Sequence, residues 1–350
     1  KRSESESMGK EISHILCAGQ ATRAIAGSVK AGLRSLLGDF SRCYHLGSIV
    51  PDTFFYAVRL PFTAGNPSEY GDILHGSEGC DTSRPAHEMM KSLRDAPNDP
   101  LFREKASFVC GYLTHMALDS TLHPYVYHVS GNYYADCPVE RREAQSRHRL
   151  IEGWFDLHLL RRIARVPATC GYVSDIRRNG TVNRELLRFF LNACEKSIPM
   201  RPSAWRDLLR GYRVQMGLNA LFGKSSVEKL VRRMDRTLGG RLMTFHSLFY
   251  PGNLQEIPRE ITHFSSFRHP VTGEERKGGF EILWKQALER SGDFLAAADA
   301  FLFAGEDDEG LRRVIQGYSL SSGLVGVAIR EAVHYDCIPL HRLRFPDKKA

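Results

Sequence analysis

Apolar residues recur at three- and four-residue spacing along most of the chain, and this periodicity predicts helices. The longest periodic segments are Ile12–Leu37, Phe102–Leu122 and Arg141–Ile163. Alternation of apolar and polar residues, which would indicate half-buried strands, is scarce. The sequence therefore predicts an all-α fold, with further helices over Arg84–Ala96, Glu185–Ser197, Ala204–Phe222, Ser225–Leu238, Gly279–Leu302 and Glu309–Ser319.

Proline, glycine and asparagine residues interrupt the periodic segments and mark the loops between them. Clear interruptions are Pro97–Pro100, Gly131–Pro138 and His269–Gly279. The Pro251–Pro258 region is a candidate joint between two parts of the chain. We therefore expect a helical domain over residues 1–256 that carries the candidate site residues, and a C-terminal helical extension over residues 257–350 packed on the same core.

The segment Gly111–Pro124 places two histidines and an aspartate among apolar residues. His115 and Asp119 are four residues apart, which puts both side chains on one face of a helix. His123 follows four residues later, rotated from His115 by about 80° at roughly 100° per residue, so it can face an adjacent position of the same site. Pro124 predicts that the helix ends there. Because such groups are costly to bury without partners, the pattern favours metal ligands over ordinary helix residues.

A second pair repeats this spacing, since His148 and Glu152 are again four residues apart on a predicted helix. A histidine and a carboxylate at this spacing suit zinc. Taken alone, the pair is more typical of an ordinary contact on a surface helix, because Arg147 and Arg149 flank His148. Because the first pair is already a candidate metal site, we interpret His148 and Glu152 as a second set of metal ligands rather than as a surface contact.

Three upstream residues can add to the site. His75 precedes Gly76, a residue that allows close approach of the backbone, and Asp52 follows Pro51 where an apolar run meets a turn or helix start. His14 lies at the head of the first amphipathic helix. For each of these residues a buried structural role is the alternative.

Composition and charge narrow the class of protein without identifying it. Hydrophobic residues make up 42% of the chain and charged residues 25%, which is ordinary for a globular protein with a buried core. The net charge of +8 suits a polyanion, an anionic membrane face or a phosphorylated substrate, although a solvated basic surface without a partner fits equally well.

The eight cysteines form no CxxC pair, so a thiolate zinc site is not expected. Their scatter indicates reduced thiols, and a few disulfides remain open. No run of about 18 apolar residues occurs, so we expect no transmembrane segment. Lys1–Lys10 is polar and lacks the apolar stretch of a signal peptide. A cytoplasmic protein is therefore expected, or a secreted one if a signal peptide has been removed before Lys1.

The motifs follow one order along the chain, namely Pro-Asp, Leu-His-Gly, HxxxDxxxHP with a Gly-Tyr lead-in, and HxxxE. This order, from His14 to about Asp156, resembles the zinc-dependent phospholipase C family and, more distantly, the P1-type nucleases. His269–Glu274, which reads HPVTGE, is a weaker echo of a loop in that family. The resemblance implies an all-helical phospholipase C/P1 nuclease-like bundle, with a metal cluster of two to three zinc ions in a cleft.

The resemblance also implies metal ligands position by position. His75, His115 and Asp119 resemble one zinc site. His148 and Glu152, with a further histidine, resemble a second site.

A third zinc site is implied by His14 together with Asp119, which would bridge two metals. Asp52 resembles the carboxylate beside the bridging water, as a ligand or as the catalytic base.

Two features of this sequence depart from the secreted bacterial enzymes. The extra histidine of the second site has a different spacing here, so His123 is preferred and His128 remains open. No tryptophan precedes His14, although an N-terminal tryptophan completes the third site in those enzymes, so that site can be weaker or empty.

The expected reaction is hydrolysis of a phosphodiester by a zinc-activated water that Asp52 orients or deprotonates. The resemblance favours phospholipase C-type cleavage of a phospholipid to diacylglycerol and a phosphorylated alcohol, with peripheral contact to a membrane. Single-strand nuclease action by the same metals is an alternative, with nucleic acid as the less favoured partner. A metal-stabilised helical binding protein without turnover is another. No residue is assigned to substrate binding.

Overall fold

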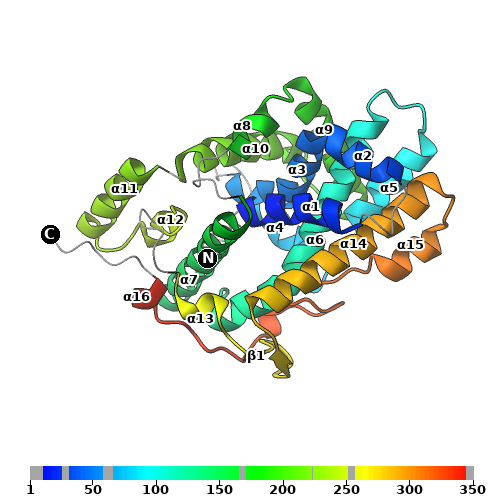
Figure 1. Cartoon of the computed structure of the whole chain (residues 1–350). Coiled ribbons are helices and arrows are strands. Elements are labelled where there is room, and N and C mark those ends of the chain that lie inside the picture. The colour runs from blue at the N-terminus through cyan, green and yellow to red at the C-terminus, as the bar shows by residue number, and fades with distance from the viewer. Residues whose placement is uncertain are drawn as a thin grey trace.

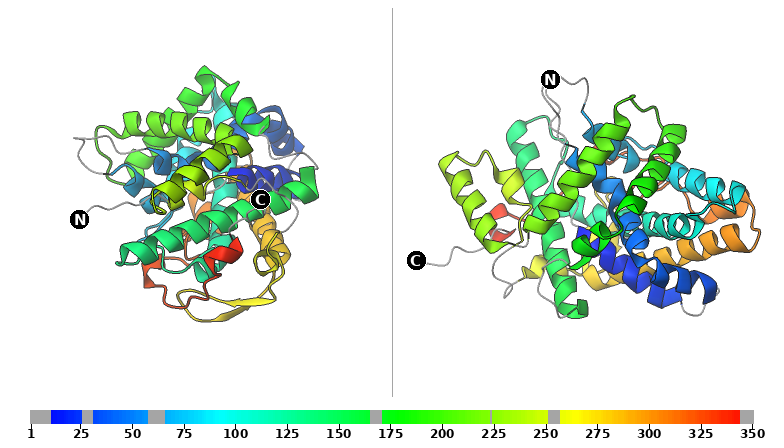
Figure 2. Two further views of the ribbon diagram at one scale, coloured as in Figure 1. Left: turned by 90° about the vertical axis from the view of Figure 1, so that its left-hand side faces the viewer. Right: turned by 90° about the horizontal axis from the view of Figure 1, so that it is seen from above.

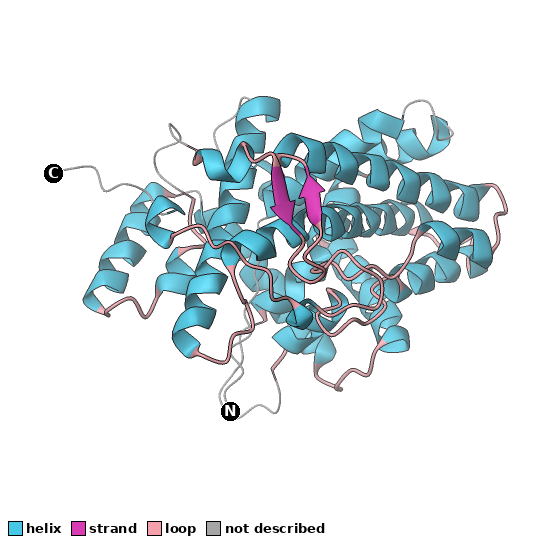
Figure 3. Cartoon of the chain, turned by 90° about the horizontal axis from the view of Figure 1, so that it is seen from below, coloured by secondary structure: helices cyan, strands magenta, loops and turns pink. Residues whose placement is uncertain are grey.

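A computed structural model describes residues 11–25, 31–57, 66–164, 171–222, 224–250 and 257–343. Within these ranges the chain forms sixteen α-helices and one two-stranded antiparallel hairpin. Figure 3 shows how small the hairpin is beside the helices. The predicted all-α fold is confirmed.

Helix α6 (Phe102–Ser130) is the central element of the fold (Figure 1). Its residues from Ala106 to Leu122 are all buried, as expected for a helix that is apolar around its whole circumference. The helices that pack most extensively against it are α1 (Glu11–Ala24), α3 (Ser41–Ile49), α5 (Arg84–Asp95), α7 (Pro138–Leu159) and α14 (Phe280–Phe303).

Shorter elements surround this centre. The antiparallel strands β1 (Ser266–Arg268) and β2 (Glu275–Lys277) pair Ser266 with Lys277. The 3₁₀ segment η2 (Val50–Tyr56) packs against α4 (Ser68–Leu74) and α10 (Ala204–Phe222). The other elements are α2 (Ala31–Asp39), the π-helical η3 (Leu160–Ala164), α8 (Gly171–Arg177), α9 (Thr181–Ser197), α11 (Ser225–Thr237), α12 (Met243–His246), α13 (Arg259–Thr262), α15 (Asp308–Val314), η4 (Ile329–Glu331) and α16 (Leu340–Leu343).

Two glycines let α3 and α6 approach backbone to backbone. A Cβ atom on Gly111 would lie 2.0 Å from the carbonyl oxygen of Tyr44, and one on Gly47 would lie 1.9 Å from that of Phe108. Contacts this short exclude any side chain at either position. The pair therefore fixes how closely α3 approaches the face of α6 that carries His115.

The expectation that α6 ends at Pro124 was wrong, because the helix continues to Ser130. Contacts from the C-terminal region stabilise the added turns. The amides of Asp336 and Ile338 donate to the carbonyl oxygens of His128 and Val129 at 2.8 and 2.9 Å, which satisfies acceptors that a helix end otherwise leaves open. These bonds join segments about 200 residues apart, so local sequence patterns do not predict them.

Other boundaries also differ from the prediction. Ile12–Leu37 contains two helices, α1 and α2, and residues 26–30 between them lie outside the described ranges. The helix predicted over Glu309–Ser319 ends at Val314, and the predicted loop His269–Gly279 contains β2. Short helices such as α3 and α4 were missed, because a segment of seven to nine residues carries little periodic signal.

The C-terminal part packs against helices of the N-terminal part. Helix α14 contacts both α6 and α1, and its residues Leu295 and Ala298 belong to the same apolar cluster as Ile15 and Leu113. Most of the joint expected at Pro251–Pro258 lies outside the described residues, so the division at residue 256 stays a prediction. Among the helices of the described ranges, none combines the length and apolarity needed to cross a bilayer.

Candidate metal centre

Eight predicted site residues converge from five elements at the centre of the helical core. Each exposes at most 12% of its side chain. They are His14 on α1, Asp52 on η2, His75 just after α4, His115, Asp119 and His123 on α6, and His148 and Glu152 on α7. The structure thus places every predicted metal-ligand candidate in one cluster.

The first group consists of His75, His115 and Asp119. The Nε2 atoms of the two histidines are 3.3 Å apart, and they lie 3.6 and 3.0 Å respectively from Oδ2 of Asp119. Ligand atoms of a tetrahedral zinc ion, each about 2.0–2.1 Å from the metal, lie roughly 3.3 Å from one another. The spacing therefore fits one zinc ion held by these three side chains.

A second group joins α6 to α7. Oε1 of Glu152 lies 3.1 Å from Nε2 of His148 and 3.3 Å from Nε2 of His123, again at zinc-ligand spacing. His128, the alternative to His123, points elsewhere, and its Nδ1 donates to the carbonyl oxygen of His334 at 2.8 Å. The geometry therefore favours His123 for this group.

Asp119 connects the groups, because its two oxygens face different partners. Oδ2 faces His75 and His115, whereas Oδ1 lies 3.4 Å from Nε2 of His14 and 3.7 Å from Nε2 of His123. A carboxylate with this division of contacts can bridge two metal ions.

Asp52 lies on the other side of the first group. Its Oδ1 atom is 3.1 Å from Nε2 of His75, and its Oδ2 atom is 4.0 Å from Nε2 of His14. His14, Asp52 and His115 form a third group with metal-ligand spacing. The position of Asp52 therefore suits a metal ligand and a catalytic base equally well.

Backbone carbonyls fix the orientation of three rings. Nδ1 of His75, His115 and His123 lies 2.8, 2.9 and 2.8 Å from the carbonyl oxygens of Gly71, Ser48 and Leu320. A carbonyl only accepts, so each Nδ1 carries a proton, and each Nε2 atom faces the carboxylates, where its lone pair is available to a metal ion when Nε2 is not protonated.

Lone pairs facing carboxylate oxygens at 3.0–3.7 Å require a cation between them. Among the described residues, Oδ2 of Asp52, Oδ2 of Asp119 and Oε2 of Glu152 are buried and have no hydrogen-bond donor. A metal ion satisfies such atoms directly. The residues present therefore fit zinc.

The electrostatics of the metal-free cluster lead to the same conclusion. Burial opposes a charge on His75, but the carboxylates of Asp119 and Asp52 outweigh it and raise the pKa of that histidine to about 10. Burial likewise opposes ionisation of Glu152, but His148 and His123 lower the pKa of the carboxyl to about 2. Without metal, a proton takes the cation's place.

His14 behaves differently from His75. Burial, together with the nearby His115 ring stacked at 4.1 Å between centroids, lowers the pKa of His14 to about 4. A histidine that is neutral at physiological pH is ready to act as a metal ligand without first losing a proton.

Residues beside the cluster were not predicted from the sequence. Asp156, one turn beyond Glu152, accepts hydrogen bonds from the backbone amide of Ser13 at 2.7 Å and from the hydroxyl of Tyr250. It thereby ties the start of α1, which carries His14, to α7. No motif marks this aspartate, because its partners are distant in sequence.

Glu11 is a second unpredicted buried carboxyl. Its Oε1 atom accepts from the Tyr56 hydroxyl at 2.5 Å and from Nε2 of Gln215 at 3.1 Å. Burial raises the pKa of Glu11 to about 7. This group joins α1 to η2 and α10 behind the cluster.

The cluster is closed in this structure. A cavity of about 20 Å³ borders His14, Asp119, His123 and Glu152, which is room for a water molecule but not for a phosphodiester. Leu320 lies beside the cluster, since its amide donates to the carbonyl oxygen of His75 at 2.9 Å and its carbonyl oxygen accepts from His123.

Aromatic residues cover the side of His148. Tyr127 and Tyr133 lie edge-on to its ring, at 4.9 and 5.3 Å between centroids. Tyr125, on the same helix as Tyr127, instead stacks on Phe264.

His269, in the segment that echoed a family loop, lies outside the cluster. Its Nε2 atom donates to the carbonyl oxygen of Ser322 at 2.9 Å, and its Nδ1 atom accepts from the amides of Val271 and Thr272. Both ring nitrogens are therefore occupied by backbone partners outside the cluster.

Comparison with known proteins gives one match. The sequence model of the family described as zinc dependent phospholipase C matches residues 13–199, which is more than half of the chain and includes all eight clustered residues. The chain matches no curated protein and no solved structure.

Proposed function

This chain belongs to the zinc-dependent phospholipase C family, and from that premise we propose that it hydrolyses phosphodiesters, with a phospholipid as substrate. The expected products are diacylglycerol and a phosphorylated alcohol. Two to three zinc ions would be held by His75, His115 and Asp119, by His123, His148 and Glu152, and by His14 with Asp52 or Asp119.

One observation carries the proposal. His75, His115 and His123 each donate from Nδ1 to a backbone carbonyl and direct Nε2 at a buried carboxylate. Three rings held in this way are oriented before any metal binds, and this preorganisation is what a catalytic metal site requires.

Zinc bound in the cluster would supply Lewis acidity, which makes water more acidic and offsets the negative charge of a phosphodiester. Asp52 is the chain's own candidate for proton transfer. Its Oδ2 atom is buried and accepts no hydrogen bond from the described residues, so it can accept a proton from water or orient that water. The chain needs no covalent nucleophile for such a reaction.

Helix α11 favours a lipid surface over a nucleic acid. Leu230, Met234 and Leu238 recur every four residues, so they form one stripe, and their exposed fractions are 58%, 47% and 43%. An apolar stripe of this kind suits the boundary between head groups and acyl chains, and a polyanion in water offers it no partner.

The charges around this stripe suit an anionic bilayer. Lys229, Arg233, Arg236 and Arg241 are exposed. The acidic residues of the helix are turned inward, since Glu228 lies 3.1 Å from His246 and Asp235 accepts the amide of Leu242 at 2.8 Å. Helix α11 lies at the left edge of the molecule in Figure 1 and in the right-hand view of Figure 2. We propose it as the face that meets anionic phospholipid.

The deciding experiment compares substrates on zinc-loaded protein. Phosphatidylcholine vesicles with some phosphatidylserine are offered beside single-stranded DNA, and diacylglycerol and nucleotide release are measured. His115→Ala should abolish lipid cleavage together with most of the zinc in its site. His158→Gln is the matched control, because this histidine on α7 is paired with Glu281 outside the cluster.

Three outcomes would each displace the proposal. Cleavage of DNA without cleavage of lipid would favour a nuclease. Zinc binding with no cleavage of either substrate would favour a metal-stabilised binding protein. Lipid cleavage that survives in folded His115→Ala protein would remove the cluster from catalysis.

A further inference from the structure

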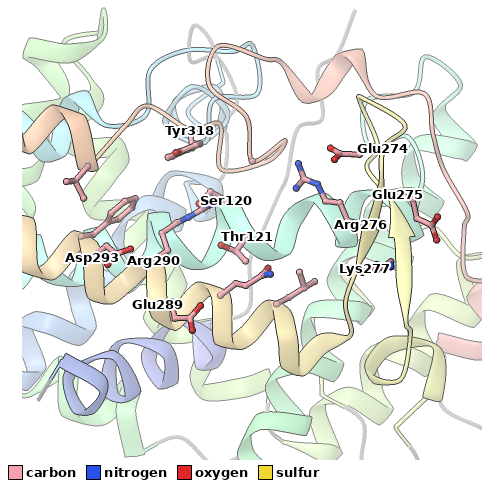
Figure 4. Close-up of a pocket in the computed structure, with 15 residues that line it drawn as sticks. Ser120, Thr121, Glu274, Glu275, Arg276, Lys277, Glu289, Arg290, Asp293 and Tyr318 are labelled. Carbon is pink, nitrogen blue, oxygen red and sulfur yellow. Dashed lines mark hydrogen bonds between the residues drawn. The ribbon is translucent and has the colours of Figure 1, made fainter. Parts of the chain in front are cut away.

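A second, larger cavity lies on another side of α6. It measures about 740 Å³ and is lined by Ser120 and Thr121 of α6, by the hairpin around Arg276, and by one face of α14 that includes Arg290 (Figure 4). None of its lining residues is among the eight clustered metal-ligand candidates. The cavity is therefore a separate site.

Two half-buried arginines enter this cavity from different elements. Arg290 donates from its guanidinium to Oγ of Ser120 at 2.8 Å and lies over the Tyr318 ring, 4.9 Å from its centroid. Arg276 enters from β2, as Figure 4 shows. Because Arg290 is held by Ser120 and Tyr318, its remaining donors have a fixed direction.

Neither guanidinium forms an ion pair with a carboxylate of the described residues. The acids that line the cavity, Glu274, Glu275, Glu289 and Asp293, are all exposed, so water screens their charges. Glu289 lies 3.6 Å from Lys285. The two half-buried cations therefore line the cavity without a direct ion pair, while the nearby carboxylates are screened by water.

This arrangement carries an electrostatic cost. Burial lowers the pKa of Arg276, the Glu274 carboxylate opposes this shift, and Arg290 lowers the pKa further. Burial also lowers the pKa of Arg290, with Tyr318 and Asp293 acting in the opposite direction. Two half-buried arginines that share a cavity, with no direct ion pair to a carboxylate, are typical of a site completed by an anion.

We propose that this cavity binds a phosphate-class oxyanion between Arg276 and Arg290. Planar guanidinium groups match the oxygens of a phosphate with paired hydrogen bonds, and Lys277 and the Thr121 hydroxyl line the same cavity. The volume exceeds what inorganic phosphate fills, so a phosphate ester fits as well.

The cavity and the metal centre share a wall. Tyr318 and Gly323 line the cavity, and Leu320 between them bonds to His75 and His123 on the metal side. A Cβ on Gly323 would lie 2.5 Å from the carbonyl oxygen of Ser120, so this segment is pressed against α6. An anion in the cavity thus lies one peptide segment from the ligands of the metal cluster.

The test measures phosphate binding by calorimetry on zinc-loaded protein. Wild type should show a phosphate-binding event that Arg276→Gln weakens by roughly tenfold or more, because a charge-assisted pair is lost. Lys196→Gln, an exposed cation on α9 that does not line the cavity, should leave binding unchanged and serves as the control. Bound zinc is measured in every variant, so that phosphate held by the metals is counted separately.

A second arm identifies the source of the phosphate. Phosphatidylcholine vesicles with and without phosphatidic acid are sedimented with the same variants. If Arg276→Gln loses binding to vesicles with phosphatidic acid but keeps its binding of inorganic phosphate, the ligand is a lipid head group. If it loses binding of inorganic phosphate, the ligand is a soluble phosphate. Arg290→Lys, which keeps the charge but not the planar fork, should show an intermediate loss. Equal binding of both probes by wild type and Arg276→Gln would overturn the proposal, whatever the activity of the metal centre.

Discussion

His115 donates from Nδ1 to the carbonyl oxygen of Ser48 over 2.9 Å, which links the most buried candidate ligand on α6 to the backbone of α3. The bond forms because Gly47 and Gly111 let the two helices meet without side chains between them. The orientation of a metal-ligand candidate therefore depends on helix packing one turn away from it.

Gly111→Ala should disturb this packing. Its new methyl group would lie 2.0 Å from a backbone oxygen that cannot rotate away, so α3 must shift. We expect a loss of roughly 1–3 kcal/mol in the free energy of unfolding, measured with urea, and a weaker affinity for zinc. Gly217→Ala on α10 is the control, because a Cβ there meets nothing within 4 Å, and it should be neutral or stabilising. Equal behaviour of the two variants would contradict the packing argument.

Zinc uptake should release protons at neutral pH. The pKa of His75 is about 10 in the metal-free cluster, so the ring is protonated at pH 7.5 and must lose that proton to bind zinc. Affinity should rise with pH until about 10. Calorimetry in buffers of different ionisation enthalpy measures the protons released, and zinc binding without proton release would refute the prediction.

The raised pKa of His75 also affects the stability of the fold, which falls with rising pH where the affinity for zinc rises. A histidine whose pKa is raised from 6.5 to about 10 by folding contributes stability that is full below pH 6.5 and is lost as pH rises through 10. Protein from which zinc has been removed by a chelator should therefore lose thermal stability between pH 6.5 and about 10, relative to zinc-loaded protein.

Glu11 should make the metal-free protein less stable as pH rises. Its pKa is about 7 in the folded protein against 4.5 in the unfolded chain, so its contribution is full below pH 4.5 and is lost as pH rises through 7. Glu11→Gln keeps the bonds to Tyr56 and Gln215 without the charge. It should be about as stable as wild type at pH 4 and more stable by roughly 3 kcal/mol at pH 9, measured by denaturant unfolding. Glu309→Gln, an exposed carboxyl, should show no such crossover.

Helix α11 should govern binding to anionic vesicles. Leu230→Asp with Met234→Asp places charges in the exposed stripe, and we expect roughly tenfold or greater loss of cosedimentation with phosphatidylserine vesicles. Cleavage of a soluble short-chain phosphodiester should be retained. Val139→Asp, at a similarly exposed apolar position on α7, is the control. Unchanged vesicle binding in the double variant would show that this face does not meet lipid.

The sequence by itself determined the class of fold and the composition of the cluster. Helical periodicity predicts the all-α fold, and four-residue spacing predicts that His115 and Asp119, like His148 and Glu152, share a face, because both depend on local geometry. The order of motifs placed the chain in its family.

Only the tertiary structure decided what lies around those residues. His123 rather than His128 meets Glu152 because α7 crosses α6 beside that turn, and α6 passes Pro124 because Asp336 and Ile338 bond to its last carbonyls. The rings of His75, His115 and His123 are oriented by backbone carbonyls, which carry no sequence signature. Arg276 and Arg290 meet because a hairpin and a helix pack against the same face of α6. Contacts between distant segments depend on packing, and no local pattern of residues encodes them.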